Sequence, residues 1–172
     1  MNHMEEPDKK WPALRRTGVL SSILDKHVRF IALADRRAQV MLAMYAFLIP
    51  LSLAGTKNPA WLPALIIFIV FALASACCAF LSLLPKRYNA VENCDCQMLH
   101  FSGISRFSES DYMERMQAML NDEDRLAAAV TRDIYHISRD ILKPKFLWVR
   151  ISYLLFFSGS TLSILTFIVN LT

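Results

Sequence analysis

Three uncharged runs, each long enough to cross a membrane, constrain this chain more than any other feature of its sequence. They are Ala38–Gly55, Ala60–Leu84 and Ile151–Thr172, with 18, 25 and 22 residues. A transmembrane α-helix needs about 20 predominantly apolar residues. The mean hydropathy of +0.33 is also high for a soluble domain. We therefore predict an all-α integral membrane protein with three transmembrane helices, at about 38–55, 60–84 and 151–172.

Two other interpretations of the first run are less consistent with the sequence. A buried helix of a soluble protein is disfavoured because the short loop Thr56–Pro59 leads directly into the stronger second run, which makes the pair a membrane hairpin. A secretory signal peptide is disfavoured because its positive region would be 37 residues long and would contain five acidic side chains.

The distribution of lysine and arginine predicts how the chain crosses the membrane. Residues 1–37 contain eight of these cations, the hairpin loop contains Lys57 alone, and residues 85–150 contain ten. By the positive-inside rule, the N-terminus and residues 85–150 face the cytoplasm, and the C-terminus faces the opposite side.

The first cytoplasmic part is predicted to change from a tail into a helix. Residues 1–17 are rich in charge and are expected to be poorly ordered, whereas residues 18–172 form one membrane domain. Apolar residues at helical spacing then run without a break into the first span, at Leu20, Leu24, Val28, Ile31, Ala34 and Ala38.

The cytoplasmic segment 85–150 is predicted to supply the rest of a helical head. Ser108 is a candidate N-cap for a short helix over Glu109–Leu120. A second helix leads into the third span and is expected to kink at Pro144, because proline removes an intrahelical hydrogen bond. The head would thus consist of two helix extensions and one short helix.

The sequence contains little that could carry out catalysis. It has no nucleophile, phosphate-binding, dinucleotide-binding or zinc-protease motif, and neither His100 nor His136 has a partner that would make it a catalytic base. Cys94, Cys96 and His100 lack the fourth ligand that a structural zinc site needs. We expect no enzyme activity, metal, cofactor or nucleic-acid partner.

The cations that border the spans lie beside one acidic residue. Arg36 and Arg37, Lys86 and Arg87, and Lys145 and Arg150 flank the three spans at one height, where they can reach lipid phosphates. A carboxylate is costly there unless it is paired, so Asp35 is expected to pair with Arg150 or Lys145 and to fix the two long helices in register. A solvated Asp35 above the headgroups is the alternative.

A stripe of small and polar residues follows the third span. Gly159, Ser163, Thr166 and Asn170 recur at steps of four, three and four. Such spacing lets helices approach closely. The stripe either packs within one subunit or forms a face between subunits, including a polar path through an oligomer.

Three segments resemble one known family. ALADRRAQVML at residues 32–42, LHFSGISRFSESDY at 99–112 and TRDIYHISRDILKPKFLWVR at 131–150 are similar, in this order, to motifs of the Pycsar effector transmembrane proteins. The likeness extends over about 24–157. Arg37 departs from the pattern, since the family usually has lysine there, and the two cations differ in hydrogen-bonding geometry.

The resemblance implies an antiphage defence effector of the bacterial inner membrane. A partner cyclase would make a cyclic pyrimidine mononucleotide, cyclic CMP or cyclic UMP, and the effector, as a homo-oligomer, would impair the lipid membrane and cause abortive infection. For the anionic ligand we predict contacts with Arg106 and Arg139, because a guanidinium group can clamp a phosphate. The alternative is a non-enzymatic scaffold or sensor subunit of a signalling complex.

Overall fold

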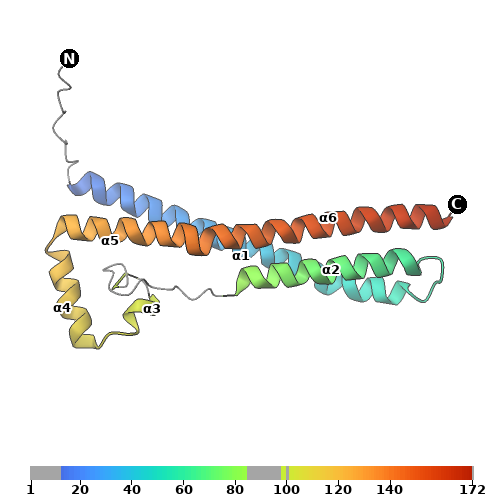
Figure 1. The fold of residues 1–172 in the computed structure, drawn as a ribbon, viewed down its shortest axis with the longest axis horizontal. Coiled ribbons are helices and arrows are strands. Elements are labelled where there is room, and N and C mark those ends of the chain that lie inside the picture. The colour runs from blue at the N-terminus through green and yellow to red at the C-terminus, as the bar shows by residue number, and fades with distance from the viewer. Residues whose placement is uncertain (1–12, 85–97, 100, 172) are drawn as a thin grey trace, which may run out of the picture. The chain divides into compact units, whose positions relative to one another are not determined.

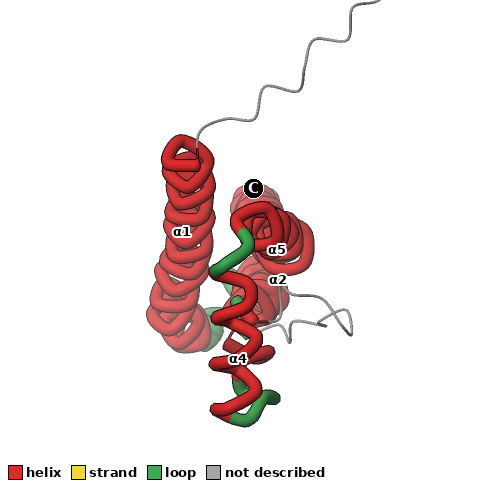
Figure 2. Tube along the Cα trace, turned by 90° about the vertical axis from the view of Figure 1, so that its left-hand side faces the viewer, coloured by secondary structure: helices red, strands yellow, loops and turns green. Residues whose placement is uncertain are grey.

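The computed structural model describes residues 13–84, 98–99 and 101–171, and its regular elements are helices (Figure 1). Figure 2 shows helices joined by loops, with no strand among these residues. Three helices are long and apolar enough to cross a membrane, which confirms the predicted fold class. The elements in chain order are α1 (Ala13–Gly55), α2 (Leu62–Leu83), α3 (Phe101–Ile104), α4 (Glu109–Leu120), α5 (Glu123–His136), the π-helical segment η2 (Ile137–Leu142) and α6 (Lys143–Leu171).

The first helix, α1, is continuous over 43 residues. It passes from the charged part of the sequence into the first apolar run without a break, as the stripe predicted. It begins at Ala13, however, within the segment expected to be a poorly ordered tail. Alanine, leucine and arginine are strong helix formers, so Ala13–Arg16 extends the helix. Residues 1–12 lie outside the described part of the chain.

The chain divides into two units, and α1 contributes residues to both. We call the described residues among 1–28 and 87–138 the head unit, and those among 29–86 and 139–172 the span unit. Each unit has its own cluster of buried apolar side chains.

In the head unit, capping residues define the helices. Ser108 accepts a hydrogen bond from the backbone N–H of Asp111, and α4 has the predicted bounds. Asp122 caps α5 in the same way through the N–H of Arg125. The buried cluster contains Met98, Met119 and Ala129. The one-turn helix α3 was not predicted, since its residues lack a helical apolar pattern.

The irregularity predicted at Pro144 takes the form of a change in helix type. The π-helical segment η2 ends two residues before this proline, and α6 begins at Lys143. Because η2 continues directly into α6, Pro144 lies inside one unbroken helical stretch, where its missing N–H removes an intrahelical hydrogen bond. The wider turns of η2 come directly before it.

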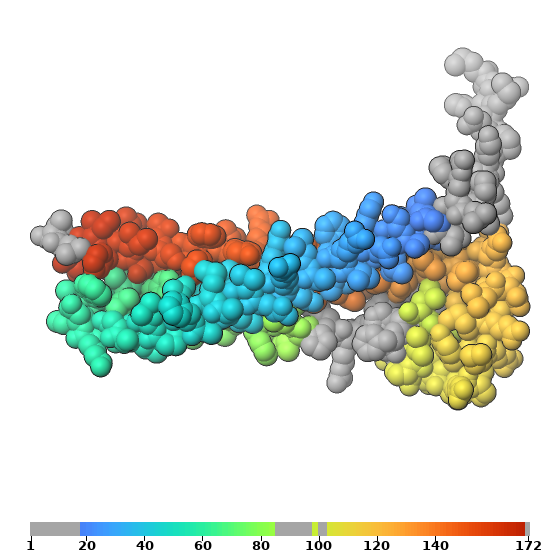
Figure 3. Space-filling model, turned by 180° about the vertical axis from the view of Figure 1, so that it is seen from behind, coloured from blue at the N-terminus to red at the C-terminus, as the bar shows by residue number. Residues whose placement is uncertain are grey.

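In the span unit, small side chains bring three helices together. The buried cluster combines Ala38, Met41 and Tyr45 of α1 with Ala72 and Ala79 of α2 and Val149 of α6. Helix α2 buries only alanine and serine. Figures 1 and 3 show α6 beside α2 and against the second half of α1. Bilayer lipids provide no hydrophobic drive for helix association, so close packing must supply the attraction between the helices. Small residues permit that close packing.

Gly159 determines how closely α2 approaches α6. A Cβ atom at this position would lie 2.3 Å from Cβ of Phe71, closer than atoms can pack. We expect Gly159→Ala to lower the free energy of unfolding by about 1–3 kcal/mol, because the clash forces the two helices apart. Thermal unfolding in detergent micelles would measure this loss.

Gly18→Ala is the matched control, since nothing lies within 4 Å of the added Cβ. It should stabilise α1 by up to about 1 kcal/mol, the helix-propensity gain of alanine over glycine. Equal effects of the two substitutions would contradict a specific contact at Gly159.

Candidate functional site

An ion pair joins α1 to α6 in the span unit. The Lys145 ammonium donates a hydrogen bond to Oδ1 of Asp35. The Lys145 side chain is 11% exposed and that of Asp35 is 30% exposed, so the pair is largely withdrawn from solvent. The backbone oxygen of Lys145 also accepts a hydrogen bond from Ser82 of α2. All three helices therefore meet at this residue.

Helical phase explains why Lys145, and not Arg150, lies against Asp35. Lys145 shares a face of α6 with the buried residues Val149 and Ser152. Arg150 is five positions further on, about 140° around the helix, and is exposed. Asp35 lies between the buried residues Ala34 and Ala38 on α1.

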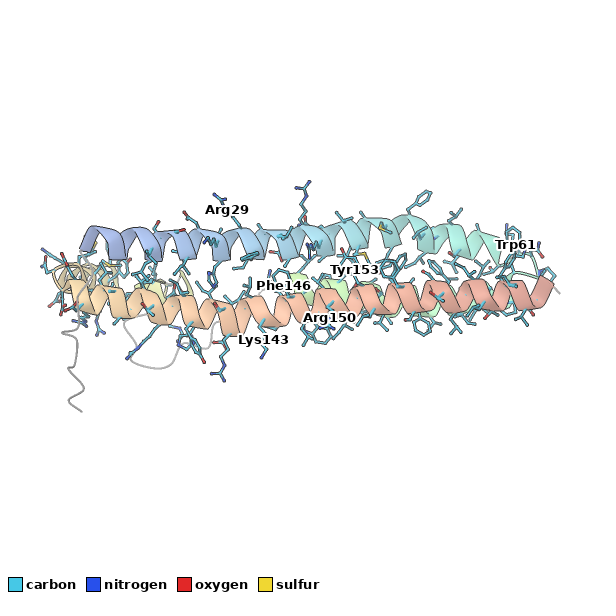
Figure 4. All side chains as sticks on the ribbon, turned by 90° about the horizontal axis from the view of Figure 1, so that it is seen from above. Arg29, Trp61, Lys143, Phe146, Arg150 and Tyr153 are labelled. Carbon is cyan, nitrogen blue, oxygen red and sulfur yellow. The ribbon has the colours of Figure 1, made fainter. Side chains whose placement is uncertain are left out.

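The other border cations that the structure describes are exposed. Arg36 and Arg37 are exposed on α1, as are Lys143 and Arg150 on α6. Figure 4 labels Lys143 and Arg150 along α6, with Tyr153 on the side that faces α1. Lys86 and Arg87 lie outside the described residues.

A second polar contact lies deeper in the spans, at Tyr45, Ser75 and Ser152. The Ser75 hydroxyl donates to the backbone oxygen of Ser152, 2.5 Å away. Because this uses its only hydrogen, Ser75 accepts from the Tyr45 hydroxyl. Tyr45, Ser75 and Ser152 are each at most 2% exposed. The resulting chain of hydrogen bonds connects α1, α2 and α6 and leaves the Tyr45 hydroxyl satisfied.

Sequence reasoning did not find this contact, although a signal was present. Tyr45 continues the apolar stripe through Ala34, Ala38 and Met41, and a phenol at such a depth needs a hydrogen-bond partner. The sequence offered several serines in the other spans and no means of choosing among them.

The small-residue stripe of the third span divides between two environments. Gly159 is buried against Phe71 of α2, and Ser163 donates to the backbone oxygen of Ala64, also in α2. These two positions therefore pack within the subunit. Thr166 and Asn170 hydrogen-bond to backbone oxygens of α6 itself, and Asn170 is exposed.

An open apolar groove of about 560 Å³ runs between α2 and α6. Two hydroxyl groups lie in it, but each donates its hydrogen within α6: Ser158 to Leu155 and Thr161 to Phe157. The groove is lined by Phe71, Leu154, Phe157, Ser158, Thr161, Leu162 and Leu165.

The head unit contains a polar contact that the sequence did not indicate. Nδ1 of His27 donates to the backbone oxygen of Ile23, and Nε2 lies 2.5 Å from the Ser138 hydroxyl. Ser138 is also placed to donate to the backbone oxygen of Ile134. These contacts link α1 to the C-terminal end of α5 within the head unit.

The two predicted ligand residues belong to different units. Arg106 is exposed in the head unit, directly after α3, and Arg139 is exposed in η2, within the span unit. Near the first of them, the guanidinium group of Arg115 lies over the Phe107 ring, 5.3 Å from its centre. The residues that the structure describes contain no cluster of three or more potential metal ligands. Cys94, Cys96 and His100 lie outside them.

Comparison with protein families matches one domain to this chain. The model of the Pycsar effector protein domain matches residues 19–170, which is most of the chain. The chain belongs to the Pycsar effector family. The family assigns it to antiphage defence and implies a cyclic-nucleotide signal from a partner cyclase. No curated protein and no solved structure matches this effector.

The matched region contains every described residue of the two polar contacts in the spans. Asp35, Tyr45, Ser75, Lys145 and Ser152 all lie within residues 19–170. In this effector an ion pair joins α1 to α6 at one level, and a hydroxyl chain joins all three spans at another. The arrangement can hold the helices in a defined register, and a change at either contact would alter that register.

Loss of the Asp35 carboxylate should leave the Lys145 ammonium without its partner. We expect Asp35→Ala to lower the free energy of unfolding by about 1.5–3 kcal/mol, the range for a hydrogen bond to a charged group. The loss should be smaller than the roughly 3–5 kcal/mol of a fully buried pair, because Asp35 is partly exposed. Exchanging the two residues, as Asp35→Lys with Lys145→Asp, should restore part of the stability.

Arg150→Ala provides the control for this ion pair, since Arg150 is exposed and lies near the same level of α6. By chemical denaturation in micelles, the free energy of unfolding of this variant should lie within about 0.5 kcal/mol of that of the parent protein. If Arg150→Ala destabilised the protein as much as Asp35→Ala, the pairing would not be the cause.

The Tyr45 hydroxyl should contribute measurably to the packing of the spans. Tyr45→Phe removes its hydrogen bond to Ser75, and we expect a loss of about 0.6 kcal/mol, with an upper limit of about 1.7 kcal/mol. Tyr153→Phe is a matched control, because this partly buried tyrosine has no hydroxyl hydrogen bond within the described residues. Unfolding in micelles would measure the free energy of unfolding of both variants. Equal losses in the two would exclude a specific role for the Tyr45 hydroxyl.

Proposed function

We propose that this effector senses a cyclic pyrimidine mononucleotide, cyclic CMP or cyclic UMP, and impairs the inner membrane in response. The family match over residues 19–170 carries the proposal. The three membrane-spanning helices support a site of action in the bilayer. The proposed activity converts no substrate. Its result would be abortive infection, in which growth stops before phage mature.

The helix α1 offers a route from signal to membrane. It contributes residues to both the head unit and the span unit, and it carries Asp35 and Tyr45, which hold it to α6 and α2. A ligand that changes the position of head residues on α1 would act on the same helix. The two polar contacts are where such a displacement would have to break or shift hydrogen bonds.

The orientation proposed for this effector places the nucleotide site in the cytoplasm. The distribution of lysine and arginine supports a cytoplasmic N-terminus and a periplasmic C-terminus. Arg106 and Arg139 remain the proposed phosphate contacts. Since they lie in different units, each is proposed and tested separately.

The exposed residues of the third span are available for assembly into a homo-oligomer. Gly159 and Ser163 pack against α2, so the stripe positions left for contact between subunits are the partly exposed Thr166 and the exposed Asn170. We propose that these two, rather than the whole stripe, face a neighbouring subunit or a polar path.

Dye-loaded liposomes containing the purified effector would test the proposal. Addition of cyclic CMP or cyclic UMP should release the dye or collapse an imposed membrane potential, whereas cyclic AMP serves as the purine control. Calorimetry on the same protein should show binding that Arg106→Ala or Arg139→Ala weakens by about tenfold or more, because a charge-assisted contact to phosphate is lost.

Two results would contradict this account. If no pyrimidine nucleotide changed the membrane, the scaffold or sensor subunit would become the better hypothesis. If both arginine variants bound nucleotide with the parent affinity, the phosphate contacts would lie elsewhere. Lys57→Ala is a control, since Lys57 is the exposed cation of the hairpin loop.

A further inference from the structure

The groove between α2 and α6 begins beside a pair of exposed cations. Leu154 lines the groove, and Arg150 lies one helical turn before it on the same face of α6. Lys143 lies two turns before Arg150, again on that face (Figure 4). Both side chains are exposed, so an anion from outside the protein can reach them.

The length of the groove corresponds to one leaflet of a membrane. From Leu154 to Leu165, helix α6 rises about 16 Å. The hydrocarbon core of a bilayer is about 30 Å thick, so one leaflet accounts for about half of it. Arg150 immediately precedes the uncharged run that starts at Ile151, and so it lies at the height of the phosphates. The groove and the cation thus have the spacing of an acyl chain and its headgroup.

The chemistry of the groove favours hydrocarbon. The Ser158 and Thr161 hydroxyls use their hydrogens on backbone oxygens of α6, so they offer no free donor to a ligand. The aromatic ring of Phe71 forms the α2 wall.

We propose that this groove binds one anionic phospholipid. Its acyl chain lies along α6 from Leu154 to Leu165, and its phosphate contacts Arg150 and Lys143. A second copy of the chain is a less favourable occupant, because copies in one membrane share an orientation. Contact through this face would bring the same cations of both copies to the same height, where like charges repel. The proposal is independent of nucleotide sensing.

Nanodiscs that contain equal amounts of phosphatidylglycerol and phosphatidylcholine provide the test. The protein is extracted from them, and the lipids retained on it are counted by native mass spectrometry. The parent protein should retain phosphatidylglycerol in preference. Lys143→Gln with Arg150→Gln should reduce that preference by about tenfold or more, since the charge-assisted contacts are lost. Ser158→Phe, which fills the groove, should reduce the retention of the lipid itself.

The control is Arg37→Gln, which removes an exposed cation from the same border region on α1. It should leave the preference unchanged. An equal loss in this variant would show diffuse attraction of anionic lipid and would overturn the site. Unchanged retention of phosphatidylglycerol by Ser158→Phe would contradict binding of the acyl chain in the groove. A Thr161→Cys variant could instead form disulfide-linked dimers and retain no phosphatidylglycerol. That result would show that a second copy of the chain occupies the groove, and it would contradict the proposed lipid.

Discussion

The absence of water from a bilayer core is the constraint on which the span unit depends. A polar side chain there must find its partner in the protein, because lipid tails offer none. The chain from Tyr45 through Ser75 to Ser152 meets this requirement with three residues from three helices. Near the border of the spans, Asp35 and Lys145 meet it with opposite charges. The same few groups therefore satisfy hydrogen-bonding demands and fix which helix faces lie together.

Packing and polar contacts act together because the buried residues are small. Helix α2 buries alanine and serine, so its backbone comes close enough for Ser75 and Ser82 to reach α6. Gly159 provides the same closeness against Phe71. Large apolar side chains would separate the helices and place these short hydroxyl side chains beyond hydrogen-bond distance. Many bulky side chains of the spans are exposed, on the surface that would face lipid, whereas Met41 and Tyr45 of α1 are buried.

The proposed function requires a membrane region that holds its form until a signal arrives. A partly exposed ion pair worth about 1.5–3 kcal/mol and hydroxyl hydrogen bonds worth about 0.6 kcal/mol each on average suit that role. Helices held by such contacts keep their register but can change it for a modest free energy. The proposed lipid at Arg150 would add a contact from the membrane itself on the outer face of α6.

The sequence by itself determined the elements of this protein, and the tertiary structure decided which of their faces meet. Apolar runs, cap residues and periodicity act locally, which is why the three spans and the bounds of α4 were predictable. The family was recognisable for the same reason, through short motifs in order. The partner of Asp35 was not, because Lys145 and Arg150 lie near the same height and differ by rotation around α6. That rotation follows from how Val149 and Ser152 pack against the other helices, a contact between distant parts of the chain that no local pattern specifies.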